Sequence, residues 1–188
     1  SDMSERYEIR FSGSGGQGMI LAGIIMAEAA GIYGDKFAAQ SQSYGPESRG
    51  GASKAEVIIS GETIDYPKAT AIDCMLAMTQ EACTKYHGDV KDGGILLVHS
   101  DEVKVLPKGR FRTLGFPIIE TARLELGKTI VANIISLGMI TELTGIVSHE
   151  NIEKWRGTLK GPSKLAAALG DGALDPELRA HAAEVLIL

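Results

Sequence analysis

Two glycine-rich segments in the first third of the chain carry the residues best suited to chemistry. The first, GSGGQG at residues 13–18, follows a strand-like stretch and precedes an apolar helix, as the G-x-G-x-x-G pattern of nucleotide-binding turns requires. Such a turn would let backbone N–H groups and the positive end of the helix approach a phosphate closely. The alternative is that the glycines only permit tight packing of the strand against the helix.

The second segment, SYGPESRGG at residues 43–51, lies between two strand-like stretches. Its glycines and Pro46 predict a shaped turn that exposes the backbone, and Arg49 offers a planar fork of donors suited to carboxylate or phosphate. Glu47 and Arg49 could instead only pair with each other, which at an exposed site contributes under about 1 kcal/mol. The candidate cofactor-binding residues of both segments are Gly13, Gly15, Gly16, Gln17, Gly18, Tyr44, Glu47, Ser48, Arg49, Gly50 and Gly51.

Other common nucleotide-binding and catalytic motifs each lack a residue that they require. The acid expected about 20 residues after a dinucleotide-binding turn is missing at the end of the second strand, where Gln40, Ser41 and Gln42 stand. Residue 122 is alanine, so Gly127-Lys128-Thr129 completes no phosphate-binding P-loop, and Ser12 replaces the glycine that a hydrolase elbow at Ser14 needs. We therefore expect no catalytic residue in this chain.

The cysteines and histidines give no metal-binding pattern. The spacing of Cys74 and Cys83 fits no zinc site, and Cys74 lies in an apolar strand, so a buried structural thiol is expected. Ser148 or its neighbour His149 is expected to cap a helix. Metal ligands are therefore not assigned.

The elements that position the two segments predict an α/β fold. Strands are expected at Tyr7–Ser12, Lys36–Ser41, Ala55–Ile59, Asp73–Met78 and Ile95–His99, and helices from about 17 to 33, at Gln80–Tyr86, at Ile118–Leu126 and from 130 to 143. No helix separates the strand near residue 55 from the extended chain up to Tyr66. The expected fold is therefore three-layered, with a mixed, mostly parallel sheet and a glycine-rich first turn between strand and helix.

Length and composition favour one globular domain. The chain has 188 residues, with 44% apolar residues and a net charge of −5, which argues against nucleic acid as a partner. Residues 1–3 read as a cloning scar followed by the initiator Met3, and residues 4–188 as a single α/β domain, helical from about residue 149. No apolar run reaches the ~20 residues that cross a bilayer, and the two cysteines fit a reducing cytoplasm.

Two of the expected helices have almost no polar face. Between Gln17 and Tyr33 only Glu28 is strongly polar, and between residues 130 and 143 the polar side chains are Asn133, Ser136, Thr141 and Glu142. A helix that is apolar nearly all round is buried on more than one side. Each helix therefore lies either in the centre of the core or at a contact with another chain.

Taken in order, these motifs resemble one family. GSGGQG after a strand, then AAQSQSYGPESRGGASKAEVIIS, IDYP and AIDCMLAMTQEA, is similar to the gamma subunit of 2-oxoacid:ferredoxin oxidoreductases, especially of the 2-oxoglutarate type. The resemblance runs from about Ile9 to Gly145 and includes TIVANIISLGMITELTG with Asn133 and Gly138. Residues after Glu150 depart from the pattern, so nothing is carried over there.

The resemblance implies an accessory subunit of a cytoplasmic complex from anaerobic metabolism. The complex makes acyl-CoA and CO2 from a 2-oxoacid by means of thiamine diphosphate, magnesium and iron–sulfur clusters. Gly170-Asp171-Gly172 lacks the asparagine that a thiamine diphosphate motif needs, and two cysteines cannot ligate the clusters. These cofactors are therefore expected on the alpha, beta and ferredoxin-like subunits, with coenzyme A as the ligand suggested for the two glycine-rich segments.

Two alternatives stay open at the level of the sequence. One is a subunit of an aryl-pyruvate oxidoreductase of the indolepyruvate type, which shares the reaction class. The other is a stand-alone nucleotide-binding protein that uses GSGGQG. In isolation the chain is expected to cover its apolar helix surface by forming a homo-oligomer.

Overall fold

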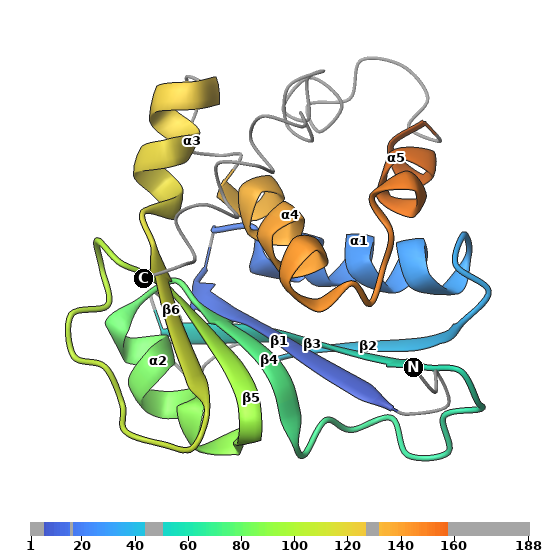
Figure 1. The fold of residues 1–188 in the computed structure, drawn as a ribbon, viewed down its shortest axis with the longest axis horizontal. Coiled ribbons are helices and arrows are strands. Elements are labelled where there is room, and N and C mark those ends of the chain that lie inside the picture. The colour runs from blue at the N-terminus through green and yellow to red at the C-terminus, as the bar shows by residue number, and fades with distance from the viewer. Residues whose placement is uncertain (1–5, 16, 44–50, 127–131, 158–188) are drawn as a thin grey trace.

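The fold is an α/β sandwich built on one six-stranded sheet (Figure 1). The computed structural model describes residues 6–15, 17–43, 51–126 and 132–157. In chain order the elements are β1 (Tyr7–Ser14), α1 (Met19–Gly31), β2 (Phe37–Ser43), β3 (Ala52–Ser60), β4 (Ile72–Ala77), α2 (Gln80–Tyr86), the 3-10 turn η1 (His87–Asp89), β5 (Val90–His99), β6 (Arg112–Phe116), α3 (Ile118–Leu126), α4 (Ala132–Thr144) and α5 (His149–Gly157).

The sheet has the strand order β2-β3-β1-β4-β5-β6 and is mixed, as predicted. β1, β4, β5 and β6 run parallel, whereas β3 pairs antiparallel with both β1 and β2. β2 and β3 therefore form a hairpin joined by the segment that contains residues 44–50. The hairpin places both ends of this segment at the edge where β1 ends, because Ser14 lies opposite Ala52.

Helices cover both faces of the sheet, which confirms the three-layer prediction. α1, α4 and α5 lie over one face and α2 over the other (Figure 1). The larger core, beneath α1 and α4, includes Ile9, Phe11, Ile25, Met26 and Ile140. A smaller core joins α2 to β4 and β5 through residues that include Met75, Cys83 and Leu96. None of the helices in the described ranges is long and apolar enough to cross a membrane.

The side of β1 that faces α2 and η1 carries a cluster of charged residues around Arg10, although buried positions are normally apolar. Arg10 is 1% exposed, and its guanidinium donates to Glu56 at 2.9 Å and to Asp89 at 2.7 Å. The same group donates to the Tyr86 carbonyl at 3.1 Å and lies over the Tyr86 ring. Every charge here has a partner, so this cluster joins β1, β3 and η1 and needs no ligand.

The first helix of the C-terminal part packs on the domain. The Trp155 indole donates a hydrogen bond to the Glu28 carboxylate of α1, and Lys36 donates to the Ile146 carbonyl at 2.7 Å. The Ser148 hydroxyl accepts from the Asn151 N–H at 3.1 Å, which confirms a cap at the start of α5. Residues 158–188 lie outside the described part of the chain.

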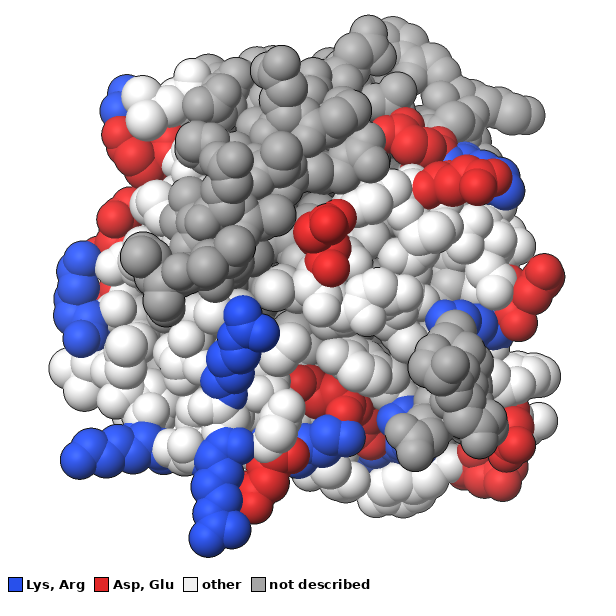
Figure 2. Space-filling view, in the orientation of Figure 1, with Lys and Arg blue, Asp and Glu red and all other residues white. Residues whose placement is uncertain are grey.

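Charged side chains of both signs share the surface. Figure 2 shows basic and acidic groups interspersed over the described part of one face, near its centre as well as at its margin. Among the described residues on this face, no group of basic side chains forms a positive patch of the kind that binds polyanions.

Both cysteines are buried thiols, as the sequence predicted for Cys74. Each is fully buried, and burial raises the pKa of Cys74 to about 12 and also raises that of Cys83. Because the thiolate is the reactive form, we expect the native protein to resist alkylation by iodoacetamide and the unfolded protein to react at both positions. Mass spectrometry after native and denatured labelling measures this, and rapid native labelling of Cys74 would contradict the burial.

Candidate functional site

The glycine turn between β1 and α1 is closed by its own glutamine. The Gln17 side-chain oxygen accepts the Ser14 N–H at 2.8 Å, and the Gln17 backbone N–H points back to the Ser14 carbonyl at 3.4 Å. A side chain at Gly13 would overlap Gln17, because its Cβ would lie 2.3 Å from that same oxygen. A Cβ at position 13 would therefore displace the Gln17 side chain that closes the turn.

Gly18 ends the turn in the left-handed region, with φ of 78°, and precedes the first residue of α1. The Ala22 N–H donates to the Gly18 carbonyl at 3.0 Å, which leaves the N–H groups of the first turn of α1 without intrahelical partners. Gly18 has no side chain that could cap these N–H groups, and the first turn contains no acidic residue. The positive end of α1 is thus available to an anion.

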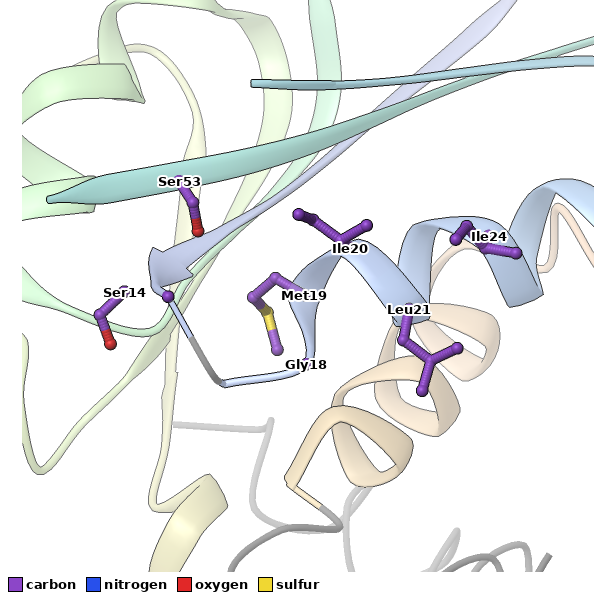
Figure 3. A pocket seen from close by; sticks show the side chains of 8 residues that line it. Ser14, Gly18, Met19, Ile20, Leu21, Ile24 and Ser53 are labelled. Atoms are coloured by element: carbon purple, nitrogen blue, oxygen red, sulfur yellow. The ribbon is translucent and has the colours of Figure 1, made fainter. Parts of the chain in front are cut away.

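A cavity of about 370 Å³ opens beside this helix end (Figure 3). Its polar rim includes Ser14 at the end of β1 and Ser53 on β3, with Gly15 and Gly18 between them. Its other lining comes from α1 and is apolar: Met19, Ile20, Leu21 and Ile24. None of these lining residues is charged. The shape and lining suit a ligand that combines an anionic group with an apolar part.

Hydrogen bonds fix the start of β3 at the same edge of the sheet. The Ala52 N–H donates to Glu81 of α2 at 3.3 Å, and the Tyr86 hydroxyl donates to the Ala52 carbonyl at 3.1 Å. The Ser53 hydroxyl donates to the Gly13 carbonyl at 3.3 Å. The first residues of β3 are therefore tied both to α2 and to the glycine turn.

The predicted site residues divide into two groups. Gly13, Gly15, Gln17 and Gly18 form one turn, and Gly51 directly precedes the start of β3 beside it. Gly16, Tyr44, Glu47, Ser48, Arg49 and Gly50 lie outside the described residues. The topology therefore brings the described members of the two glycine-rich segments to one edge, and the roles assigned to all eleven residues remain predictions.

This edge is also where the connections of the sheet diverge. α1 leads from β1 towards β2 over one face, whereas α2 leads from β4 towards β5 over the other. Ligands of open α/β sheets bind outside the carboxyl ends of the strands at such a switch point. The Met78 N–H donates to the Ser12 carbonyl at 2.9 Å and continues the pairing of β1 with β4 up to the turn. The fold therefore favours the same place as the local geometry.

His99 ends β5 on this edge and supports α3. Its Nδ1 accepts the Ile118 N–H at 3.1 Å, so the imidazole must be neutral at that nitrogen, and the residue is 1% exposed. Burial lowers the pKa of His99 below its ordinary value of 6.5, although Asp101 and Glu102 act in the opposite direction. His99 therefore caps the start of α3.

Acidification should weaken the fold through His99. Because its pKa is lower in the folded chain than in the unfolded chain, unfolding binds a proton. The contribution of neutral His99 to the free energy of unfolding is complete above pH ~6.5. It declines by at most about 1.4 kcal/mol per pH unit as the pH falls towards the pKa of His99 in the folded chain. Denaturant titrations at several pH values measure this slope. His99→Asn keeps an acceptor without a titrating ring and should flatten it, and an unchanged slope would assign the effect to other groups.

Sequence reasoning did not assign three residues that the structure places at the turn. Ser14 and Ser53 line the cavity, and the side chain of Asn133 from α4 packs against Gly18. A signal existed for Asn133, because it is one of few polar residues in an apolar helix. Its proximity to Gly18 depends on the packing of α4 against α1 and could not be read from local sequence.

The described residues contain no candidate metal site. Among them, no three His, Cys, Asp or Glu side chains are grouped so that they could hold a metal ion. The fold and the turn define an α/β protein whose candidate binding site lies at the carboxyl ends of its parallel strands.

Comparison with known proteins assigns the family. The model of the family "Pyruvate ferredoxin/flavodoxin oxidoreductase" matches residues 8–166, and the chain belongs to this family. The chain is 50% identical over 151 residues to the 2-oxoglutarate synthase subunit KorC of Methanocaldococcus jannaschii, covering 79% of this chain and 81% of that protein. The resemblance seen in the sequence motifs is thus confirmed.

Two solved structures share the fold. The gamma subunit of a keto/oxoacid ferredoxin oxidoreductase from Geobacter sulfurreducens superposes with a TM-score of 0.76 at 52% identity, covering 96% of this chain and 94% of that one. A 2-oxoglutarate:ferredoxin oxidoreductase chain from Magnetococcus marinus superposes with a TM-score of 0.74 at 21% identity, covering 96% of this chain and 30% of that longer one. The predicted α/β fold with a mixed sheet is confirmed.

Proposed function

We propose that this chain is the gamma subunit of a multisubunit 2-oxoglutarate:ferredoxin oxidoreductase. The overall reaction converts 2-oxoglutarate and coenzyme A into succinyl-CoA and CO2, and the two electrons released reduce ferredoxin. The observation that carries the proposal is the 50% identity to a 2-oxoglutarate synthase subunit across most of both chains. An aryl-pyruvate substrate is the alternative within the same reaction class.

The donor set of this chain supports a non-redox role. Iron–sulfur clusters are usually held by four thiolates, whereas this sequence has two cysteines and both are buried. Thiamine diphosphate with its magnesium, and the clusters, therefore belong to the alpha, beta and ferredoxin-like subunits in this proposal. When bound there, they supply the carbanion and electron-transfer chemistry.

The contribution of this chain is to bind and orient. The positive end of α1 and the cavity beside Ser14 suit the phosphates of coenzyme A, and the 44–51 segment contributes Arg49 as a further anion ligand. The same segment docks against the catalytic subunits. The half-buried apolar residues of α1, namely Ile20, Leu21 and Ile24, favour a contact with another chain. In the isolated subunit the same residues would promote self-association.

Anaerobic affinity purification of the chain from its source cells tests the assembly. Bound proteins are identified by mass spectrometry, and the eluate is assayed for coenzyme A-dependent dye reduction with 2-oxoglutarate, pyruvate, 2-oxoisovalerate and indolepyruvate. We expect thiamine-binding and cluster-binding chains to co-elute and 2-oxoglutarate to drive reduction. Recovery of the chain alone, stabilised thermally by NAD or FAD, would instead establish a stand-alone nucleotide-binding protein.

Arg49→Ala tests the role of the second segment in the assembled enzyme. Loss of one charge-assisted hydrogen bond should raise the Michaelis constant for coenzyme A or the oxoacid about tenfold or more. Steady-state kinetics of the purified complex, together with its subunit composition, provide the measurement. An intact complex with unchanged constants would remove Arg49 from the site.

A further inference from the structure

The connection between β5 and β6 displays two large aliphatic side chains to solvent. Val105 is 72% exposed and Leu106 is 54% exposed, and the two are consecutive in the chain. Residues 104–110, here called the β5–β6 loop, run down the left side of the molecule in Figure 1, beside α2. Single apolar residues on a surface are ordinary, whereas an adjacent exposed pair is a candidate contact with another molecule.

Hydrogen bonds from α2 hold the backbone of this loop in place. The Gln80 side-chain oxygen accepts the N–H groups of Lys104 and Val105, each at 2.9 Å, and the Gln80 amide donates to the Val105 carbonyl at 3.0 Å. One carboxamide therefore satisfies both backbone polar groups of Val105. The path of the chain is fixed there, while the Val105 side chain stays exposed.

The two ends of the loop are anchored as well. Val103 is buried in the smaller core, and Phe111 packs against that core from the other end of the loop. The Phe111 ring also lies close to Gly109, where a Cβ would come within 2.1 Å of a ring carbon. The Gly93 N–H donates to the Arg110 carbonyl at 2.7 Å. A loop held in this way loses little conformational freedom on binding, which favours recognition.

Basic side chains flank the aliphatic pair. Four of them are exposed: Lys104, Lys108, Arg110 and Arg112. Residues 103–112 contain no acid, although the net charge of the chain is −5, and Asp101 and Glu102 precede them. The Arg110 guanidinium lies 3.6 Å from Asp92, and both side chains are largely exposed, so this pair is weak. Because apolar and basic groups alternate, the loop suits an apolar pocket bordered by carboxylates better than a continuous polyanion.

We propose that the β5–β6 loop is a docking surface for another subunit of the complex, which receives Val105 and Leu106 in an apolar pocket bordered by Asp or Glu side chains. This inference rests on the proposed function, because it needs a partner subunit. It places a contact on the α2 side of the sheet, opposite α1. Burial of the aliphatic pair supplies affinity, and the basic groups set the orientation and the rate of encounter.

Photo-crosslinking within the assembled complex tests this surface. The chain carries p-benzoylphenylalanine in place of Leu106 and is co-expressed with the other subunits and purified anaerobically, and mass spectrometry maps the crosslink. The matched control has the same replacement at Leu124 on α3, which is 65% exposed. We expect position 106 to crosslink to a segment of one partner subunit that contains Asp or Glu, and position 124 not to reach that segment. Capture of a second copy of this chain, or no capture from position 106 in an intact complex, would overturn the proposal.

Affinity measurements on variants give an independent result. Interferometry measures binding of the chain to the remaining subunits. Leu106→Asp should raise the dissociation constant about tenfold or more, because the contact is lost and the new carboxylate meets those of the partner, whereas Leu124→Asp should change it less than about twofold. Lys108→Glu combined with Arg110→Glu should slow association and flatten its dependence on salt. Circular dichroism checks that each variant is folded.

The outcomes separate the docking surface from the subunit assignment. Equal dissociation constants for Leu106→Asp and the unaltered chain, in a complex that assembles, would overturn the docking surface alone. If the unaltered chain bound none of the other subunits, both the docking surface and the proposed function would fail.

Discussion

Replacement of Gly18 by alanine is expected to lower the free energy of unfolding by about 2–5 kcal/mol. Two causes add. The backbone at Gly18 has φ of 78°, a conformation that costs a residue with a Cβ about 1–2 kcal/mol. The new Cβ would also lie 2.8–3.0 Å from three atoms of Asn133, and such overpacking costs about 1–3 kcal/mol. Chemical denaturation followed by circular dichroism measures the change.

Gly15→Ala is the matched control within the same turn. A Cβ at Gly15 would meet no atom within 4 Å, and its φ is not in the left-handed region. We expect its effect to stay below about 1 kcal/mol. In Gly18→Ala combined with Asn133→Ala, the contacts with Nδ2 and Cγ are removed but the contact with the Asn133 Cβ at 3.0 Å stays, so part of the steric loss should be recovered and the backbone part should remain. Equal effects of Gly15→Ala and Gly18→Ala would show that neither cause operates.

Arg10→Met should destabilise the fold by about 3–5 kcal/mol, as the breaking of a buried ion pair does. The substitution leaves Glu56 with Lys54 as its remaining cation at 2.8 Å, and it removes the donor to the Tyr86 carbonyl. The reason for the large effect is the burial of Arg10 and Glu56, since the other partner, Asp89, is about half exposed. Equilibrium unfolding in guanidinium chloride measures the loss.

A surface arginine provides the comparison. Arg123 pairs with Glu120 on α3, and both side chains are about half exposed, so Arg123→Met should cost less than about 1 kcal/mol. Adding Glu56→Leu to Arg10→Met removes the largely buried carboxylate that has lost Arg10 and retains only Lys54, and should restore part of the stability. If Arg10→Met proved as mild as Arg123→Met, the buried cluster would contribute little to stability.

Much of the fold could be predicted from hydrophobic patterns and turn residues. The alternation in Tyr7–Ser12 and the glycines after it identified β1, the turn and α1, because these signals are local. The mixed sheet followed from the absence of a helix between residue 53 and Tyr66, and β3 is indeed antiparallel to both of its neighbours.

Edge and irregular elements could not be predicted in the same way. β6, at Arg112–Phe116, was not foreseen, since five residues with a glycine and buried side chains at Leu114 and Phe116 give too short a pattern. β5 was expected only from Ile95, whereas it begins at Val90. Its earlier half contains Gly93 with φ of 79°, and the pairing with β4 shifts register there, which obscures the alternation.

The candidate site shows the same division between local and distant information. The glycine turn was recognisable because its residues are consecutive. The contact of Asn133 with Gly18 joins two helices far apart in the chain, and only the packed structure reveals it. The closure of the turn by Gln17 was also not foreseen, because a side chain that folds back on its own loop has no sequence signature.

The position of β1 has a consequence for synthesis. β1 lies in the interior of the sheet and is made early on the ribosome, yet both neighbours, β3 and β4, come later in the chain. Until residue 77 has been made, β1 lacks at least one of its two partner strands. The helix α1 lacks its neighbour α4 for longer, until residue 144 has been made. The nascent subunit therefore spends much of its translation with unpaired strand edges exposed, and its folding must wait for long-range contacts.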